Sequence, residues 1–163
     1  LDVENILALY QPVAIDLRLV LASHKINHDL ERIGDNMEGI AKYIVKTNGQ
    51  LEEALVASFN TIEMFEKAAE MITEVSEAFD KEDTSLARRI FKKDDWLNAN
   101  NSAATGVAVE HLKKPDVNHE QVLYVLSIIR KLERIGDLSK NLAEEIIFYI
   151  DAKVLKHKKK PRS

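Results

Sequence analysis

Two segments of the chain, LERIGDNMEGIAKYI (residues 30–44) and LERIGDLSKNLAEEI (residues 132–146), open with the same six residues. Their apolar residues also recur at matching offsets. At the 100° per residue of an α-helix, these residues gather away from the glutamate of the hexamer, Glu31 in one copy and Glu133 in the other. They are Leu30, Ile33, Ile40, Ala41 and Ile44 in the first copy, and Leu132, Ile135, Leu142, Ala143 and Ile146 in the second. The pattern predicts two long helices with a repeated buried stripe, and hence an internal duplication of a helical unit.

The composition indicates an all-α protein. Of its 163 residues, 45% are hydrophobic and 31% are charged, five are glycine and three are proline, and alternating β-branched runs are scarce. The absence of cysteine excludes disulfides and thiolate metal sites. The net charge of -4 excludes a broad basic surface for nucleic acid, and no apolar run is long enough to span a membrane.

The first half of the chain contains two predicted helices. Pro12 suits the first turn of a long helix over residues 13–46, because proline lacks only an N–H that is unpaired there anyway. The sequence TNG at residues 47–49 ends this helix. A second helix is predicted over residues 51–79, and DKEDT forms the turn that follows it.

The second half contains two more predicted helices. Asp83 or Thr84 caps a third helix that runs to about Leu112, and KKPDVN forms the clearest loop of the chain. Asn118, with a glutamine three residues later, resembles a capping box. It opens the last helix, which runs to about Lys156.

Each hexamer carries two features that disfavour a helix. Glu31 and Asp35, like Glu133 and Asp137, are carboxylates one turn apart, which repel each other by a few tenths of a kcal/mol. The glycine beside them costs about 1 kcal/mol relative to alanine. Because this cost recurs in both copies, it indicates a close packing contact or a function.

Two interpretations of the acidic pairs remain open. In the first, each pair belongs to a solvated polar helix face, and Arg32 and Arg134 neutralise carboxylates. In the second, each pair shares a metal ion with acidic residues from neighbouring helices, as in helix-bundle carboxylate sites. Oxygen ligands favour Mg, Ca, Mn or iron, and zinc becomes suitable if a histidine joins them.

Two histidines precede the first hexamer on the same predicted helix. His24 and His28 fall in one stripe with Glu31 and Asp35, at spacings of four, three and four residues. This spacing suits a metal site of mixed nitrogen and oxygen ligands. The second copy has no histidine at these offsets, so two ordinary surface histidines remain the alternative.

Three stretches occur in order along the chain: YQPVAIDLRLVLASHKINHDLERIGDNMEGIA (residues 10–41), EDTSLARRIFKKDDWLN (residues 82–98) and ERIGDLSKNLAEEIIFYI (residues 133–150). Together they resemble the PhoU family of bacterial phosphate-signalling proteins. The resemblance implies repeated three-helix bundles, of which the first is incomplete at its N-terminus in this chain. Residues 1–48 are then the remainder of the first bundle, and residues 51–157 form the second. Residues 158–163 form a basic tail that frays into solvent or contacts an acidic partner or an anionic membrane surface.

The resemblance also implies metal binding. Members of the family bind multinuclear iron or zinc clusters at their E-x-x-x-D motifs. Carried over position by position, the implied metal ligands in this chain are Glu31, Asp35, Asp94, Glu133 and Asp137. Asn98 stands where the family often has aspartate, so the second cluster is expected to have fewer or weaker ligands.

The function implied by the resemblance is that of a regulatory adaptor and not of an enzyme. Such an adaptor represses the phosphate-starvation response from the cytoplasm or from the inner face of the membrane. Its partners are a phosphate ABC transporter, a sensor histidine kinase, and further copies of itself in a homodimer or higher homo-oligomer. A regulatory domain of a longer sodium–phosphate symporter is the first alternative. A metal-dependent helical-bundle enzyme is the second, disfavoured because such enzymes direct E-x-x-H motifs inward, whereas these acidic pairs are predicted to face outward.

Overall fold

The computed structural model describes residues 3–158, including the side chains of residues 3–14 and 16–151. Nearly all of the predicted basic tail at residues 158–163 therefore lies outside the described residues. Within them the chain is all-α, as predicted from its composition. The helices are α1 (Val3–Tyr10), α2 (Ile15–Lys46), α3 (Glu53–Ser58), α4 (Thr61–Asp80), α5 (Thr84–Leu112) and α6 (His119–Lys158). None of the described helices is both long enough and apolar enough to cross a membrane.

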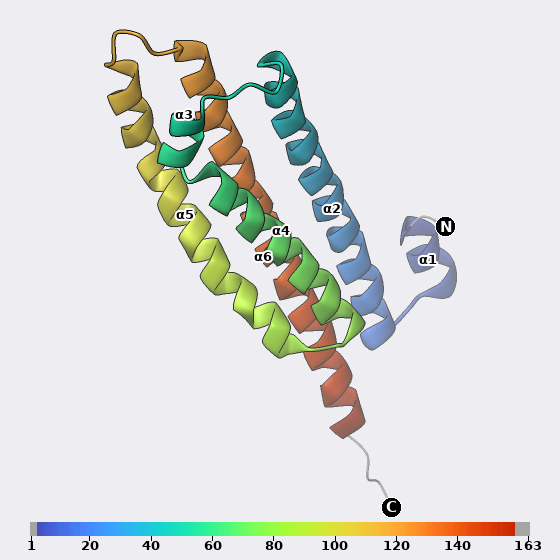
Figure 1. Ribbon diagram of the computed structural model, residues 1–163. Helices are drawn as coiled ribbons and strands as arrows, with labels where there is room; N and C mark the ends of the chain where they lie inside the picture. Colours follow the sequence, from blue (N-terminus) through green and yellow to red (C-terminus); the bar gives the residue numbers. More distant parts are fainter. Residues whose placement is uncertain (1–2, 159–163) are drawn as a thin grey trace, which may run out of the picture.

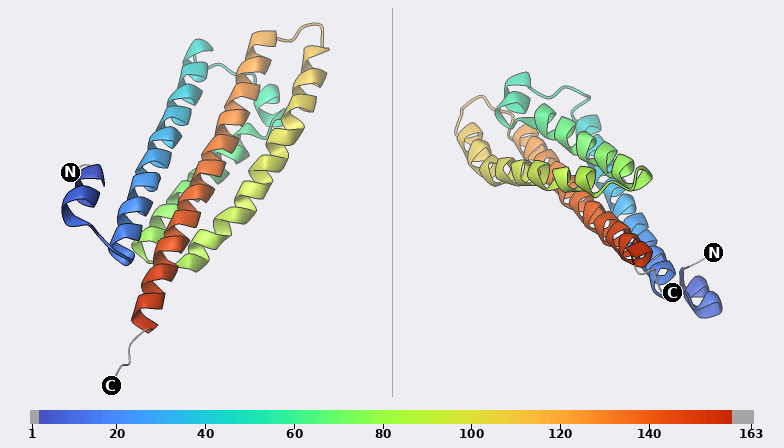
Figure 2. Two further views of the ribbon diagram at one scale, coloured as in Figure 1. Left: turned by 180° about the vertical axis from the view of Figure 1, so that it is seen from behind. Right: turned by 90° about the horizontal axis from the view of Figure 1, so that it is seen from below.

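Helix α6 is the centre of the arrangement. It packs with α4 and α5 as a three-helix bundle, and α2 packs against it as well (Figure 1). Figures 1 and 2 show α2 and α6 running in opposite directions, with the C-terminal end of α6 extending past the other helices. Helix α1 contacts α2 and lies apart from the bundle.

The duplicated apolar stripe is fully buried in the second copy only. On α6 all five of its residues are buried, as predicted: Leu132, Ile135, Leu142, Ala143 and Ile146. On α2, Ile33 and Ile40 are buried, but Leu30 is 47% exposed, Ile44 is 41% exposed, and Ala41 is exposed. The prediction of burial is therefore wrong at these last three positions. The cause is packing, because α6 is enclosed by α2, α4 and α5, whereas α2 packs against α6 alone for most of its length.

Helix α2 begins later than predicted and ends where predicted. Pro12 precedes the helix and does not form its first turn, because Gln11 and Ala14 have positive φ angles of 42° and 53° that redirect the chain. The TNG sequence after Lys46 ends the helix. Gly49 has a left-handed φ of 72°, a conformation that glycine adopts without steric cost.

The single helix predicted over residues 51–79 is wrong, since the structure divides it into α3 and α4. The break is at Asn60, which has a left-handed φ of 51°. Asparagine tolerates this conformation better than most residues. The side chain of Asn60 also donates from Nδ2 to Asn100 Oδ1 at 2.9 Å, and the preceding Phe59 is buried in the core. Helix periodicity alone carries no sign of such a break.

The predicted N-terminal caps of α5 and α6 are confirmed. Asp83 Oδ1 accepts a hydrogen bond from the Ser85 N–H at 2.7 Å, and Asn118 Oδ1 accepts one from the Gln121 N–H at 3.1 Å. In a full capping box the Gln121 side chain would return to Asn118. Instead its Nε2 donates to the Gln50 carbonyl oxygen at 3.0 Å. This bond ties the start of α6 to the connection between α2 and α3.

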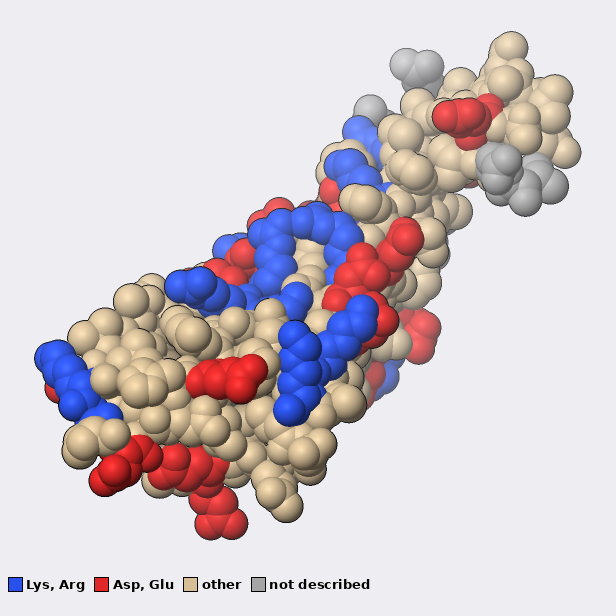
Figure 3. Space-filling model, turned by 90° about the horizontal axis from the view of Figure 1, so that it is seen from above, with Lys and Arg blue, Asp and Glu red and all other residues tan. Residues whose placement is uncertain are grey.

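Charges of both signs are mixed on the face of the molecule seen from above. Lysine and arginine side chains lie interspersed with aspartate and glutamate side chains there (Figure 3). This face therefore lacks the continuous basic surface that binds nucleic-acid phosphates.

Candidate functional site

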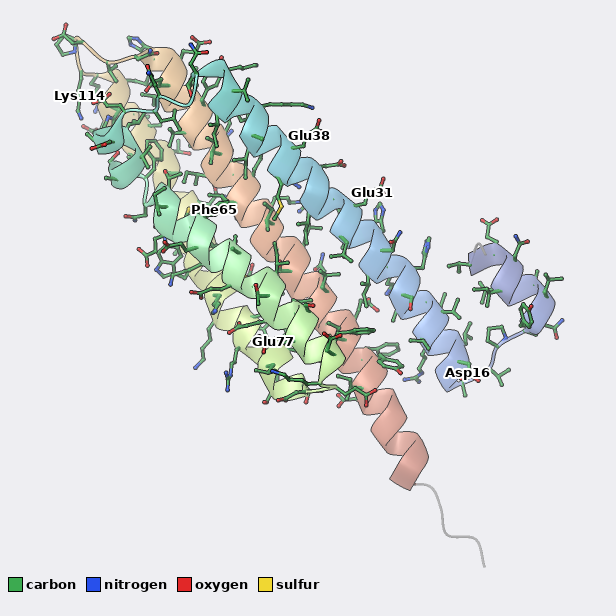
Figure 4. All side chains as sticks on the ribbon, turned by 45° about the vertical axis from the view of Figure 1, so that its right-hand side comes forward. Asp16, Glu31, Glu38, Phe65, Glu77 and Lys114 are labelled. Atoms are coloured by element: carbon green, nitrogen blue, oxygen red, sulfur yellow. The ribbon has the colours of Figure 1, made fainter. Side chains whose placement is uncertain are left out.

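The two copies of the hexamer lie in different surroundings. Glu31 and Asp35 are exposed on α2, and Figure 4 shows Glu31 projecting away from α4 and α6. The outward orientation predicted for this pair is confirmed. Glu133 and Asp137 are only partly exposed, where α6 packs against α5. Together with Asp94 of α5, these two residues are called the carboxylate cluster below.

Gly136 allows α5 to approach α6 at the carboxylate cluster. A Cβ atom at this position would lie 2.5 Å from Leu97 Cδ1 and 3.7 Å from Asp94 Oδ1. The equivalent Gly34 on α2 is different, because a Cβ there would meet no atom within 4 Å. A close packing contact therefore explains the glycine of the second hexamer. This is one of the two explanations that the helix-destabilising glycine in both copies had indicated. The described residues contain no such contact for Gly34.

Asp94 is the buried member of the cluster, with a side chain that is 0% exposed. Its Oδ2 accepts hydrogen bonds from Lys140 Nζ at 2.9 Å and from Asn98 Nδ2 at 3.2 Å. Its Oδ1 is buried and has no hydrogen-bond partner. A buried carboxylate oxygen without a partner is costly, so the site favours a further positive charge or donor.

The other two carboxylates crowd each other. Burial raises the pKa of Glu133, and the nearby charges of Asp137 and Asp94 raise it further, against opposing effects of Arg134 and Asn101. Asp137 Oδ2 pairs with Arg134 at 3.4 Å across one helical turn. The predicted neutralisation by Arg134 is therefore present in the second copy. In the first copy Arg32 pairs not with the hexamer acids but with Asp29, at 3.2 Å.

The carboxylate cluster offers oxygen donors of the kind that divalent cations prefer. It has three carboxylates, including a buried oxygen without a partner, and the amides of Asn98 and Asn101 lie beside it. Two of its carboxylates are paired with Lys140 and Arg134. In the described part of the chain, however, no three histidine, aspartate or glutamate side chains lie close enough together to hold a metal ion as they stand.

The predicted ligands on α2 are not brought to this cluster. His24 and His28 are exposed on α2, as are Glu31 and Asp35, and the described residues supply no third carboxylate to that pair. The candidate ligands on α2 and on α5–α6 therefore form two separate groups.

Two residues of the site were missed by reasoning from sequence. Lys140 binds Asp94, and the side chain of Asn101 lies near Glu133, where it acts to lower the pKa of that carboxyl. A signal for Lys140 was available, because a residue three positions after Asp137 and seven after Glu133 shares their helix face. For Asn101 no signal existed before α5 was placed against α6.

Known proteins resemble this chain in both of its halves. A family model described as the PhoU domain matches residues 2–44 and 61–146. The chain is 31% identical over 153 residues to the phosphate-specific transport system accessory protein PhoU homolog 1 of Thermotoga maritima, covering 93% of this chain and 65% of that protein. It is 29% identical over 153 residues to the phosphate-specific transport system accessory protein PhoU of Escherichia coli K12, covering 94% and 63%. The chain therefore spans less than two thirds of the length of these relatives.

A solved structure shares the fold. The crystal structure of PhoU from Pseudomonas aeruginosa superposes with a TM-score of 0.82 at 29% sequence identity, covering 91% of this chain and 71% of that one. The arrangement of α2 and α4–α6 is thus one that an experimentally determined protein adopts.

Proposed function

The chain belongs to the PhoU family, and from this premise we propose that it is a regulatory adaptor of phosphate uptake and signalling that represses the phosphate-starvation response. The observation that carries the proposal is the match of the family's domain to residues 2–44 and 61–146, which contain both copies of LERIGD. The relatives from Thermotoga maritima and Escherichia coli are named accessory proteins of phosphate-specific transport, not enzymes. This chain would act in the same way at the cytoplasmic side of a phosphate ABC transporter, together with a sensor histidine kinase.

An exposed apolar stripe on α2 supports a role in assembly. Leu30, Met37 and Ile44 are 41–47% exposed and recur at seven-residue spacing along this helix. The corresponding positions of α6 are buried in the three-helix bundle. A row of exposed apolar side chains is typical of a surface that another helix covers. We assign this stripe to self-association in a homodimer or higher homo-oligomer.

A complementation experiment tests the adaptor role. In a bacterial host that lacks its own PhoU, expression of this chain should restore repression of a phosphate-starvation reporter at high phosphate. The host with an empty vector is the control. Full expression of folded protein without any repression would contradict the adaptor proposal.

We further propose that the carboxylate cluster binds a divalent metal ion through Asp94, Glu133 and Asp137, with Asn98 as a weaker ligand. The buried, unpartnered Asp94 Oδ1 and the crowding that raises the pKa of Glu133 support this, because both would be relieved by positive charge. Iron or zinc is the family's implied metal, and oxygen ligands suit Mn, Mg or Ca as well. When bound, the ion would neutralise the cluster and fasten α5 to α6. The second predicted site, at Glu31 and Asp35 with His24 and His28, needs a further ligand from outside α2.

Elemental analysis by mass spectrometry tests the metal sites. The wild-type protein should contain iron or zinc, and Glu133→Gln with Asp137→Asn should lower that content. The matched variant Glu31→Gln with Asp35→Asn changes the same residue types in the exposed hexamer. It reports how much of the metal the α2 site contributes. Equal metal content in the wild type and in both double variants would contradict metal binding at the E-x-x-x-D motifs.

A further inference from the structure

Helix α4 carries two rows of apolar side chains, of which only one is needed for the core. The first row, which includes Met64 and Met71, is buried. The second row stands one residue later along the chain and is called the α4 stripe below. It consists of Ile62, Phe65, Ala69, Ile72, Ser76 and Phe79, at alternating spacings of three and four residues. Its large members Ile62, Phe65 and Phe79 are 46–60% exposed.

The α4 stripe has the shape of a seat for another helix. Helix α4 lies in front of α6 in Figure 1, and Figure 4 marks Phe65 on it. Apolar side chains that alternate at spacings of three and four residues form the seam along which two helices pack. Two open grooves border the stripe. One, of about 540 Å³, lies beside Ile62 where α3 meets α4, and the other, of about 570 Å³, lies beside Phe65 and is also lined by Lys93 of α5.

An acidic row runs beside the α4 stripe. Its members each stand one residue after a stripe position, and they are Glu63, Glu66, Glu70, Glu77 and Asp80. Lysines pair with three of them, Glu63, Glu70 and Glu77. Among the described residues, no lysine or arginine lies within ion-pair distance of Glu66 or Asp80. In the groove beside Phe65, moreover, Oε2 of Glu74 is buried without a hydrogen-bond partner. The face therefore lacks positive charge and N–H donors next to its apolar seam.

We propose that the α4 stripe docks an amphipathic helix of a partner protein, with apolar residues along one face and lysine or arginine on both sides of it. The basic side chains would pair with Glu66 and Asp80 and donate to Glu74. The α4 helix of a second copy does not fit, because two acidic rows would then face each other, and an anionic membrane surface is repelled for the same reason. This inference rests on the adaptor role proposed above, for which it supplies a contact surface.

Two designed peptides test the docking surface. Both are amphipathic helices with leucine at heptad positions, and they differ only in having lysine or glutamate on the flanks. In fluorescence anisotropy the wild-type chain should bind the lysine peptide about tenfold more tightly than the glutamate peptide. Equal affinity for the two peptides, or no binding of either, would overturn the proposal.

Variants locate the binding on α4. Phe65→Ser with Phe79→Ser should weaken binding of the lysine peptide at least about tenfold. The control Leu123→Ser removes an apolar side chain of similar exposure, 52%, from α6 and should bind like the wild type. Glu66→Lys with Asp80→Lys breaks no ion pair of the described residues and should reverse the preference between the peptides. Circular dichroism checks that each variant keeps its helix content. Unchanged binding by folded Phe65→Ser with Phe79→Ser would overturn the proposal.

The reporter assay distinguishes this inference from the adaptor role. Loss of repression by folded Phe65→Ser with Phe79→Ser, when the wild type represses, would support docking through the α4 stripe. Full repression by that variant would overturn the docking surface and leave the adaptor role in place. Failure of the wild type to repress would contradict the adaptor role, and the peptide titration would still decide the docking surface. A shift of the variant toward monomer in sedimentation, without peptide binding by the wild type, would assign the stripe to a second copy and overturn the proposal.

Discussion

Replacement of Gly136 by alanine tests the close approach of α5 to α6. The added Cβ would lie 2.5 Å from Leu97 Cδ1, far inside the range of ordinary van der Waals contact. Leu97 is fully buried, so its methyl group has no solvent to rotate into. Either Leu97 adopts a strained rotamer or α5 shifts away from α6, and a shift would also move Asp94.

The magnitude follows from two opposing effects. Alanine is favoured over glycine in a helix by about 1 kcal/mol. Forcing a methyl group into a filled core costs about 1–3 kcal/mol, so Gly136→Ala should lower the free energy of unfolding by about 0–2 kcal/mol. Gly34→Ala is the matched control, because it lies in the same hexamer and its Cβ would meet nothing within 4 Å. That variant should gain about 1 kcal/mol, which separates the two by about 1–3 kcal/mol.

Chemical denaturation followed by circular dichroism measures this difference directly. In thermal unfolding each kcal/mol corresponds to about 2–4 °C for a chain of this size. The ranking should be Gly34→Ala above the wild type and Gly136→Ala at or below it. If Gly136→Ala is as stable as Gly34→Ala, then α5 does not contact α6 as described, and the explanation of the second glycine is refuted.

Three further predictions concern other parts of the chain. Asp83→Ala should lower the midpoint of thermal unfolding at neutral pH, because Asp83 caps α5. The hydrogen bonds from Ser85 lower the pKa of Asp83 in the folded protein. The stabilisation by the cap is therefore complete above pH 3.8, the ordinary pKa of aspartate, and is lost as the pH falls through the lowered pKa. If Asp83→Ala still unfolds at a lower temperature than the wild type in strong acid, this explanation is contradicted. Asn60→Val should lower the free energy of unfolding in urea by about 1–2 kcal/mol, because φ is 51° at this position. Asn60→Gly should lower it less, since glycine adopts this φ freely. Equal losses in the two variants would mean that the hydrogen bond to Asn100, and not the backbone conformation, is responsible. Met37→Glu should shift the protein toward monomer in sedimentation with its helix content unchanged, and an unaltered distribution would argue against self-association through α2.

Several features of the fold could be predicted because they depend on residues close in sequence. The stop after Lys46, the caps at Asp83 and Asn118, and the buried stripe of α6 follow from hydrogen-bonding capacity and from the 3.6-residue period. The break at Asn60 could not be predicted in this way. It depends on Phe59 entering a core built by other helices, which no local pattern encodes.

The candidate site was predictable in its members but not in its arrangement. The residues at Asp94, Glu133 and Asp137 were identified from the motif and from the family resemblance. The difference in burial between Glu133 and Asp137 on the one hand and Glu31 and Asp35 on the other could not be predicted, since both hexamers have the same sequence and the same helical geometry.

The sequence by itself thus determined that this chain is helical, internally duplicated and provided with two acidic hexamers, because these properties arise within single helices. Only the tertiary structure decided that α5 covers one hexamer and leaves the other exposed. It also decided that Lys140 stands against a buried Asp94. The physical reason is that burial and charge pairing are properties of helix contacts, and identical helix faces differ once one acquires a neighbour and the other does not.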